Sequence, residues 1–355
     1  MKCSLPRKGL AVVNILLFVG ISVIPSGISI QTHAKKIITV DDEPGDADYT
    51  CIQDAVDNAE EGDIIMVYSG IYEPTRIRKT IILEGISYEL GSGNDTGKPV
   101  IQQQDDHDRL LTLIDVNDCT IQGFDLLHGG EGIIIFASSD NVILENNISF
   151  CDKGISVHSI TGTSKNNYFV ENIIKDNDIG MDFEFSFYNV ICNNQIFNNR
   201  ENGIELSYSE QNKIFNNIFK NNGFFDEQGS GVYFFISSDN IVEDNIFKGN
   251  RMGIMLVYDS SNNSIKYNNF LHNIRSIVIY GPSNNSIKYN NFLHNIRSAT
   301  FYLSNNNTWD YNYWNRPRLL PKLIIGYNEG EYSMILQINT DWHPARKPYN
   351  IPGIR

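Results

Sequence analysis

The sequence has few basic residues and only one long hydrophobic run. Its 355 residues include 28 Lys and Arg against 42 Asp and Glu, which gives a formal net charge of −14. A chain this acidic repels phosphate backbones, so we exclude nucleic acid as a partner. Acidic polysaccharides would be repelled as well, unless a bridging cation or a local basic strip intervenes. No apolar run after residue 24 is long enough to span a bilayer.

The one long apolar run lies at the N-terminus. Lys2, Arg7 and Lys8 precede a nearly apolar segment, Gly9 to Ile24, and Pro25 then breaks it. This pattern is typical of an export signal, and the run is short for a membrane span. We therefore predict a signal peptide and pre-sequence over residues 1–34, with a retained anchor as the alternative. The mature protein is then expected to be secreted or held at the cell surface.

Cysteine and histidine are also scarce. Cys3 falls inside the predicted signal, and two histidines, His272 and His294, recur in equivalent positions of a repeat. Two histidines do not complete a metal site, so we predict no copper site and no cofactor. Export permits disulfides, and the alternatives are three pairings or buried free thiols for the four remaining cysteines: Cys51, Cys119, Cys151 and Cys192.

Internal repetition is the dominant feature of the sequence. The segment SNNSIKYNNFLHNIRS at Ser261–Ser276 recurs unchanged at Ser283–Ser298, an offset of 22 residues. Looser copies continue upstream to Ile143. Alignment of the copies produces two asparagine columns, the second five residues after the first. The first column is Asn146, Asn172, Asn194, Asn217, Asn245, Asn268, Asn290 and Asn312; the second is Asn177, Asn199, Asn222, Asn250, Asn273 and Asn295.

This pattern has a specific physical meaning. Short strands joined by sharp bends need residues that tolerate the left-handed backbone region, and we expect the column asparagines to fill that role. Coils stacked at about 4.8 Å also let equivalent asparagines form hydrogen bonds along a column. The lack of a 3.6-residue period argues against helical repeats. The sequence thus predicts an all-β fold, a single-stranded right-handed parallel β-helix over residues 35–314.

Both ends of this β-helix require caps, because the end coils would otherwise expose the hydrophobic core. Thr50 is predicted to begin a short helix, with Gln53 completing a capping box and Gly62 ending it. Such a helix can plug the open end of the coil stack, as repeat arrays require. After Asn312 the repeat stops, and we predict a C-terminal capping tail over residues 315–355.

Glycine-led strands in successive coils suggest a candidate site. Because side chains alternate along a strand, two outward columns can be aligned. One is Ser156, Asp182, Glu205, Tyr233, Met255, Val278 and Thr300, and the other is His158, Glu184, Ser207, Phe235, Val257, Tyr280 and Tyr302. The predicted catalytic residues are Asp182, Glu184, Glu205 and His158. The predicted carbohydrate-binding residues are Tyr233, Phe235, Tyr280 and Tyr302.

The three carboxylates support more than one chemistry. Asp182 and Glu205 should lie about 5 Å apart across the ladder, and Asp182 and Glu184 about 7 Å apart along the strand. Carboxyl groups that cleave glycosidic bonds have similar separations. The same three groups could instead hold Ca²⁺, or be ordinary exposed acids. Neither column contains Lys or Arg, which argues against a pectate-type lyase.

A family resemblance accompanies these patterns. The stretch ITVDDEPGDADYTCIQDAVDNAEEGDIIMVYSGIYEPTRIRKTIILEG from Ile38 resembles the opening of pectin-lyase-like β-helix proteins. With the ENN and GI repeats, and NYW at Asn312–Trp314, the chain is most similar to the NosD group, also described as carbohydrate-binding and sugar-hydrolase (CASH) modules. The resemblance covers Ile38 to Trp314. It implies the fold, but this fold hosts lyases, hydrolases, esterases, epimerases and non-enzymes.

Three functional hypotheses follow. The first is a monomeric, secreted or cell-surface protein that binds polysaccharide or cell-envelope glycan with little or no catalysis. The second is a polysaccharide hydrolase or lyase that uses the acidic residues of the outward columns. The third, implied by the NosD resemblance, is an accessory role in copper-enzyme maturation.

Overall fold

The structure is a computed structural model that describes residues 35–91, 93–103, 108–159, 164–224, 229–304, 306–329 and 334–351. The predicted signal peptide and pre-sequence of residues 1–34 lie outside the described residues, and they stay a prediction. Within the described residues, no helix is long and apolar enough to cross a membrane.

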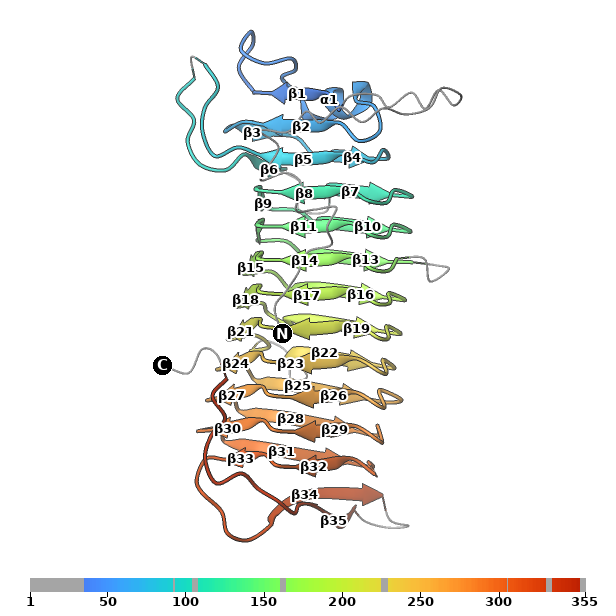
Figure 1. The fold of residues 1–355 in the computed structure, drawn as a ribbon, viewed down its shortest axis with the longest axis vertical. Coiled ribbons are helices and arrows are strands. Elements are labelled where there is room, and N and C mark those ends of the chain that lie inside the picture. The colour runs from blue at the N-terminus through green and yellow to red at the C-terminus, as the bar shows by residue number, and fades with distance from the viewer. Residues whose placement is uncertain are drawn as a thin grey trace, which may run out of the picture.

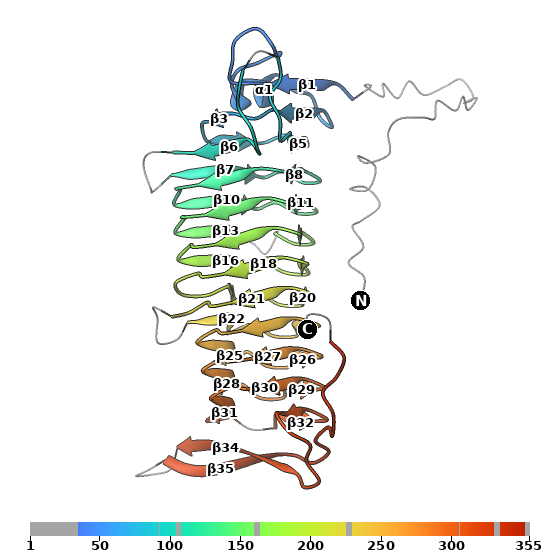
Figure 2. The same ribbon diagram turned by 90° about the vertical axis from the view of Figure 1, so that its left-hand side faces the viewer.

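The described chain forms a tall stack of coils, and each regular coil adds one strand to each of three parallel sheets (Figures 1 and 2). Sheet A contains β1 (Ile37–Val40), β2 (Ile64–Val67), β5 (Ile82–Gly85), β8 (Thr120–Gln122), β11 (Val142–Leu144), β14 (Tyr168–Val170), β17 (Val190–Cys192), β20 (Lys213–Phe215), β23 (Ile241–Glu243), β26 (Ser264–Lys266), β29 (Ser286–Lys288) and β32 (Thr308–Asp310).

Sheet B contains β3 (Ile71–Tyr72), β6 (Val100–Gln102), β9 (Asp125–Leu127), β12 (Asn147–Ser149), β15 (Ile173–Lys175), β18 (Gln195–Phe197), β21 (Ile218–Lys220), β24 (Ile246–Lys248), β27 (Asn269–Leu271), β30 (Asn291–Leu293) and β33 (Tyr313–Trp314). Sheet C contains β4 (Thr75–Ile77), β7 (Arg109–Ile114), β10 (Glu131–Phe136), β13 (Lys153–His158), β16 (Ile179–Glu184), β19 (Ile204–Ser207), β22 (Ser230–Phe235), β25 (Met252–Val257), β28 (Arg275–Tyr280), β31 (Arg297–Tyr302), β34 (Lys322–Glu329) and β35 (Met334–Asp341). The predicted parallel β-helix is therefore confirmed.

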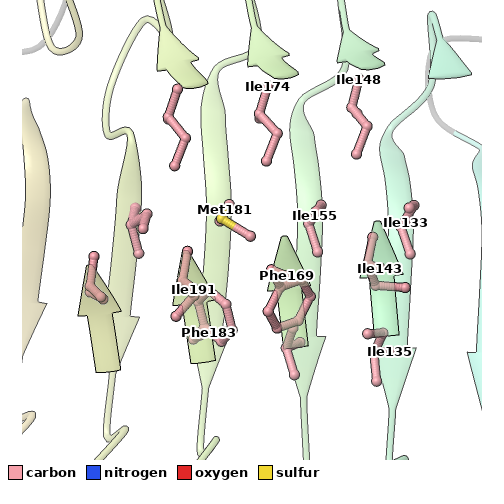
Figure 3. Close-up of a cluster of buried hydrophobic side chains, with 14 of the residues drawn as sticks. Ile133, Ile135, Ile143, Ile148, Ile155, Phe169, Ile174, Met181, Phe183 and Ile191 are labelled. Carbon is pink, nitrogen blue, oxygen red and sulfur yellow. The ribbon is translucent and has the colours of Figure 1, made fainter. Parts of the chain in front are cut away.

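The hydrophobic core runs along the axis of the stack. Side chains from all three sheets point inward, and equivalent positions stack from coil to coil (Figure 3). Ile148 and Ile174 come from sheet B, Ile155 from sheet C and Phe169 from sheet A, and all are fully buried. Because each coil is too thin to bury its own apolar side chains, stability comes from stacking on neighbouring coils.

Both predicted asparagine columns are continuous ladders inside the stack. Asn217 is typical: its Nδ2 donates to Asn245 Oδ1 at 3.1 Å, and its Oδ1 accepts from Asn194 N and Nδ2 at 2.9 and 3.0 Å. A third ladder, which the sequence alignment missed, runs along the bend after sheet C. Its members are Asn141, Asn167, Asn189, Asn212, Asn240, Asn263, Asn285 and Asn307.

The predicted reason for asparagine at the bends was wrong. The ladder asparagines do not have positive φ; the residue before each of them does. Next to the first ladder these residues are Glu145, Glu171, Asn193, Asn216, Asp244, Tyr267, Tyr289 and Tyr311. Asparagine is needed in the ladder because it is buried and supplies both a donor and an acceptor to its neighbours, which a buried polar group requires.

The N-terminal end is closed by helix α1 (Ile52–Asn58), whose Ile52, Ala55 and Val56 are buried. The predicted capping box is absent, since Cys51 is the N-cap residue and makes no side-chain cap bond. Gln53 instead accepts a hydrogen bond from the backbone N of Arg76 at 2.8 Å. The helix is thus attached to β4 through this side chain.

The C-terminal end carries an antiparallel pair, β34 and β35. β34 extends sheet C by pairing in parallel with β31, and β35 then pairs with β34. Figure 1 shows this pair at the end of the stack opposite α1. The boundary at residue 314 stays a prediction, although sheets A and B end at β32 and β33 within the described residues.

Three of the cysteines are free thiols: Cys51, Cys119 and Cys151. Cys119 and Cys151 are buried, and burial raises the pKa of each thiol to about 12. The three pairings of the four cysteines into two disulfides are therefore excluded. The alternative of buried free thiols is correct for Cys119 and Cys151.

Candidate functional site

The predicted outward columns of sheet C are in register. Ser156 pairs with Asp182, Asp182 with Glu205 and Glu205 with Tyr233. The neighbouring column pairs His158, Glu184, Ser207 and Phe235 in the same way and continues through Val257 to Tyr280 and Tyr302. The candidate site residues therefore share one face of the β-helix, as the repeat spacing predicted.

His158 lies between two carboxylates on this face. Its Nε2 is 3.5 Å from Glu131 Oε1, and its Nδ1 is 3.5 Å from Glu184 Oε2. Glu131 also binds Arg109, with 2.8 Å from Nε to Oε2. Burial alone raises the pKa of Glu131, but the side chains of His158 and Ser156 and the charge of Arg109 outweigh it and lower this pKa to about 2. Glu131 is thus held ionised.

The neighbouring coils hold a second ionic group. Lys153 Nζ lies 2.6 Å from Asp182 Oδ2, and Asp182 is nearly buried. Glu205, one coil further, accepts a hydrogen bond from Asn202 Nδ2 at 3.0 Å. Burial and the negative charge of Asp182 raise the pKa of Glu205, although Asn202 and Lys153 act against this shift. Asp182 is therefore an ion-paired carboxylate beside Glu205, whose proton is retained to a higher pH.

The three predicted catalytic carboxylates do not form a metal cage. Among the described residues, two groups of acidic side chains bring three ligand atoms within 4.8 Å of one another, and neither contains Asp182, Glu184 or Glu205. Calcium binding was one of the sequence-based alternatives for these three carboxylates. In this structure their ligand atoms are not gathered into the compact set that a calcium ion would need.

Aromatic side chains form a strip along the same face and its edge. We define the aromatic strip as Phe185, Tyr208, Phe235, Tyr258, Tyr280, Tyr302 and Tyr327. Phe185 stacks on Tyr208 with ring centroids 4.9 Å apart, and Phe235 contacts Tyr208 and Tyr258 edge-on at 5.5 and 5.0 Å. Tyr302 lies between Tyr280 and Tyr327, 5.9 Å from each.

Beside the strip lies an apolar patch on the outward side of β22, β25 and β28. Met252, Met255, Val257 and Val278 are buried there, and Tyr233 packs against them. Tyr233 thus has a packing role on the candidate face, whereas Tyr280 is 44% exposed and Tyr258 is 59% exposed. The exposed rings of the strip are the ones that can contact a ligand.

A hollow of about 780 Å³ lies at the N-terminal end of the same face, and Arg76, Arg78, Lys79 and Arg109 are among its lining residues. Arg76 pairs with Thr112, which continues the outward column of Ser156 and Asp182. Lys79 is engaged with the end of α1, donating to the carbonyls of Asp57 and Ala59. Asp57 and Asp108 also line the hollow, so its four basic side chains outnumber two acidic ones.

Sequence reasoning missed part of this site. Glu131, Lys153 and Arg109 occupy the first positions of β10, β13 and β7, outside the two columns that were aligned. Neither column contains Lys or Arg, as aligned, but the long side chains of Lys153 and Arg109 bring basic groups to the acids from the first strand positions. Tyr208 and Tyr258 follow the strands directly, at bends with φ of 51° and 53°. Alignment of every position of each coil would have found both sets.

Solved structures with a similar fold come from viruses and from a bacterium. A structure named Geobacillus virus E2 ORF18 has a TM-score of 0.57 at 12% identity, over 80% of this chain and 59% of the other. The enzymatically active domain of bacteriophage CBA120 tailspike protein 2 has a TM-score of 0.56 at 13% identity, over 74% and 44%. DFA-IIIase from Arthrobacter chlorophenolicus A6, in complex with GF2, has a TM-score of 0.50 at 12% identity, over 72% and 85%. This chain thus spans less than two thirds of the two viral chains.

No curated protein matches the sequence significantly. A family model does: the one described as "Right handed beta helix region" matches residues 105–270 and 224–315, which together make up more than half of the chain. This match agrees with the parallel sheets and stacked ladders described above. The chain belongs to the right-handed β-helix family.

Proposed function

We propose that this protein is a secreted or cell-surface β-helix that binds a glycan chain along the outward face of sheet C. The observation that carries the proposal is the aromatic strip, a run of rings over successive coils in which five of the seven members are exposed and which lies beside hydrogen-bonding acids. Sugar rings have apolar faces that stack on aromatic side chains, while their hydroxyl groups need nearby donors and acceptors.

The face offers both kinds of contact over an extended length. Glu184, with its side chain 48% exposed, and His158 border the strip and can exchange hydrogen bonds with hydroxyl groups. The excess of basic side chains in the hollow near Arg76 and Arg78 would attract an acidic group of a saccharide at that end, despite the net charge of −14. A linear ligand lying parallel to the stack is therefore the best match to the geometry.

Two of the similar structures are consistent with this class of function. One is named as the enzymatically active domain of a phage tailspike, and another as an enzyme in complex with GF2. At 12 to 13% identity the likeness extends to the fold alone, so the proposal depends on the side chains of this chain.

The test is a binding screen of the purified protein against a glycan array and insoluble polysaccharides. We expect retention on at least one polysaccharide, with loss of retention when exposed rings of the strip are removed. Failure to bind any glycan in both formats would count against the proposal.

A second candidate function is glycan cleavage, favoured by the raised pKa of Glu205 beside the ion-paired Asp182. In this case Glu205 would act as the acid, and an ionised neighbour would act as base or nucleophile. Product analysis on the polysaccharides that bind, with Asp182→Asn and Glu205→Gln, separates the two functions. Binding without products supports the first function, and product formation that both substitutions abolish supports the second.

A further inference from the structure

Carboxylates from two distant segments gather at the N-terminal end of the β-helix. Asp41, Asp42 and Glu43 follow β1 directly, and Glu89 and Asp95 lie in the segment between β5 and β6. Ligand atoms of Asp41, Asp42 and Glu43 lie within 4.8 Å of one another, and the same holds for Glu43, Glu89 and Asp95. Glu43 therefore joins the two groups into one acidic cluster, which consists of these five residues.

The most buried member of the cluster has no hydrogen-bond partner. Asp41 is 0% exposed, and neither of its carboxylate oxygens accepts a hydrogen bond. One oxygen of Asp42 and one of Glu43 are likewise buried without a partner. A buried carboxylate without a donor is costly, and such groups are normally paired or bound to a metal. The unsatisfied oxygens belong to side chains whose ligand atoms converge, which points to a missing cation.

Three other oxygens of the cluster, one from Asp42 and two from Glu89, are held by the backbone. Asp42 Oδ2 accepts from the backbone N of Ile71 at 3.0 Å, and Glu89 accepts from Leu90 N and Asp95 N at 3.0 and 2.9 Å. Gly70 also makes room for Asp42, because a Cβ at this glycine would overlap the Asp42 carboxylate. These contacts orient the side chains before any ligand arrives, as ligands of a metal site are oriented by their second-shell partners.

Like charges in this cluster repel each other. Burial, followed by the charges of Glu89 and Asp42, raises the pKa of Asp41 to about 6. Among the ion pairs of the described residues, none joins Lys or Arg to the cluster. A cation would remove this repulsion and satisfy the orphan oxygens at the same time.

We propose that the acidic cluster is a binding site for a divalent cation of the calcium class. The donors are all carboxylate oxygens, which hard cations prefer, and soft or nitrogen donors that would favour zinc or copper are absent from the five. Flexible coordination by several carboxylates suits Ca²⁺ better than Mg²⁺, which demands octahedral geometry and retains water. The bound ion would fasten the chain after β1 to the segment between β5 and β6, at the end that α1 closes.

The test uses the full chain, stripped with EDTA and titrated with CaCl₂ by calorimetry. A parallel titration with Tb³⁺ uses the nearby Tyr68 and Tyr72 to sensitise terbium emission. We expect one Ca²⁺ site, tighter than for Mg²⁺, and displacement of Tb³⁺ by Ca²⁺. Asp41→Asn and Glu43→Gln should each weaken Ca²⁺ binding by about tenfold or more. The Asp182→Asn, Glu205→Gln double variant is the matched control and should bind Ca²⁺ like the wild type.

Thermal melting separates loss of the site from loss of the fold. In EDTA, Asp41→Asn should melt at or above the wild-type temperature, because the substitution removes a repelling charge. In Ca²⁺ the wild type should gain stability and the variant should not. Absence of Ca²⁺ and Tb³⁺ binding by the wild type would overturn the proposal. So would equal affinity in Asp41→Asn and wild type, or loss of binding in the control alone.

Discussion

Asp341 takes the place of the next asparagine beyond Asn312. Its Oδ2 accepts from the backbone N of Asn312 at 2.9 Å and from Asn312 Nδ2 at 3.3 Å, as each ladder asparagine accepts from the one before it. The same oxygen accepts from Trp314 Nε1 at 2.9 Å. Asp341 is fully buried and comes from β35. The ladder is therefore terminated by a carboxylate from the C-terminal segment.

This relationship predicts a difference between two substitutions of Asp341. Asp341→Asn keeps the shape and an acceptor oxygen, so it should change the free energy of unfolding by about 1 kcal/mol or less. Asp341→Ala leaves the donors of Asn312 and Trp314 unsatisfied and should destabilise the C-terminal coils by about 2 to 4 kcal/mol. Hydrogen exchange at Asn312 and thermal melting would measure both. Equal effects of the two substitutions would contradict the ladder-termination role.

A second prediction separates the two roles of adjacent asparagines. Asn217→Ala removes hydrogen bonds to Asn194 and Asn245 inside the ladder and should cost about 2 to 4 kcal/mol of stability. Asn216 has a φ of 58°, which glycine adopts freely, so Asn216→Gly should cost about 1 kcal/mol or less. Denaturant unfolding of both variants provides the comparison. A larger loss at Asn216 would restore the view that asparagine is needed for its backbone conformation.

The partly buried Glu131 predicts a defined pH dependence. Its folded pKa of about 2 lies below the usual 4.5, so the fold favours the ionised form. The resulting contribution to the free energy of unfolding is fully present above about pH 4.5 and is lost as the pH falls through 2. Glu131→Gln should therefore destabilise the protein at pH 7 by about 1 to 3 kcal/mol, with a much smaller difference near pH 2. Paired melting curves of wild type and variant across this range measure the effect, and a constant difference would contradict it.

Ring removal tests the aromatic strip without harming the bends. Tyr208 and Tyr258 have positive φ, which asparagine tolerates, so Tyr208→Asn and Tyr258→Asn should fold normally. Each should weaken glycan binding about fivefold to tenfold, since an exposed stacking contact is worth about 1 kcal/mol.

Tyr289→Asn is the matched control for these variants. Tyr289 also has positive φ, at 60°, and stacks between Tyr267 and Tyr311, at the bend between sheets A and B. Tyr289→Asn should leave unchanged the affinity for the polysaccharide that the wild type binds. Equal weakening by all three substitutions would show that the strip is not the binding surface.

The coil and its register could be predicted from the repeats in the sequence. Alignment of the repeat copies places equivalent side chains of successive coils beside each other, so the pairing of Asp182 with Glu205 followed from the sequence. The inward and outward sides of each strand followed from the alternation of Ile204, Glu205 and Leu206. These features are periodic, and residues one repeat apart in the sequence become neighbours in space when the coils stack.

Contacts that do not recur from coil to coil could not be predicted in this way, because they depend on how the chain folds. Lys153 reaches Asp182 on the next coil because its side chain is long, and Asp341 meets Asn312 because the final strands fold back over the last coil. Asp41 and Glu89 come together through two irregular segments before the regular repeats begin. Side-chain reach and the path of irregular segments depend on the packed coils around them, and one repeat unit does not encode them.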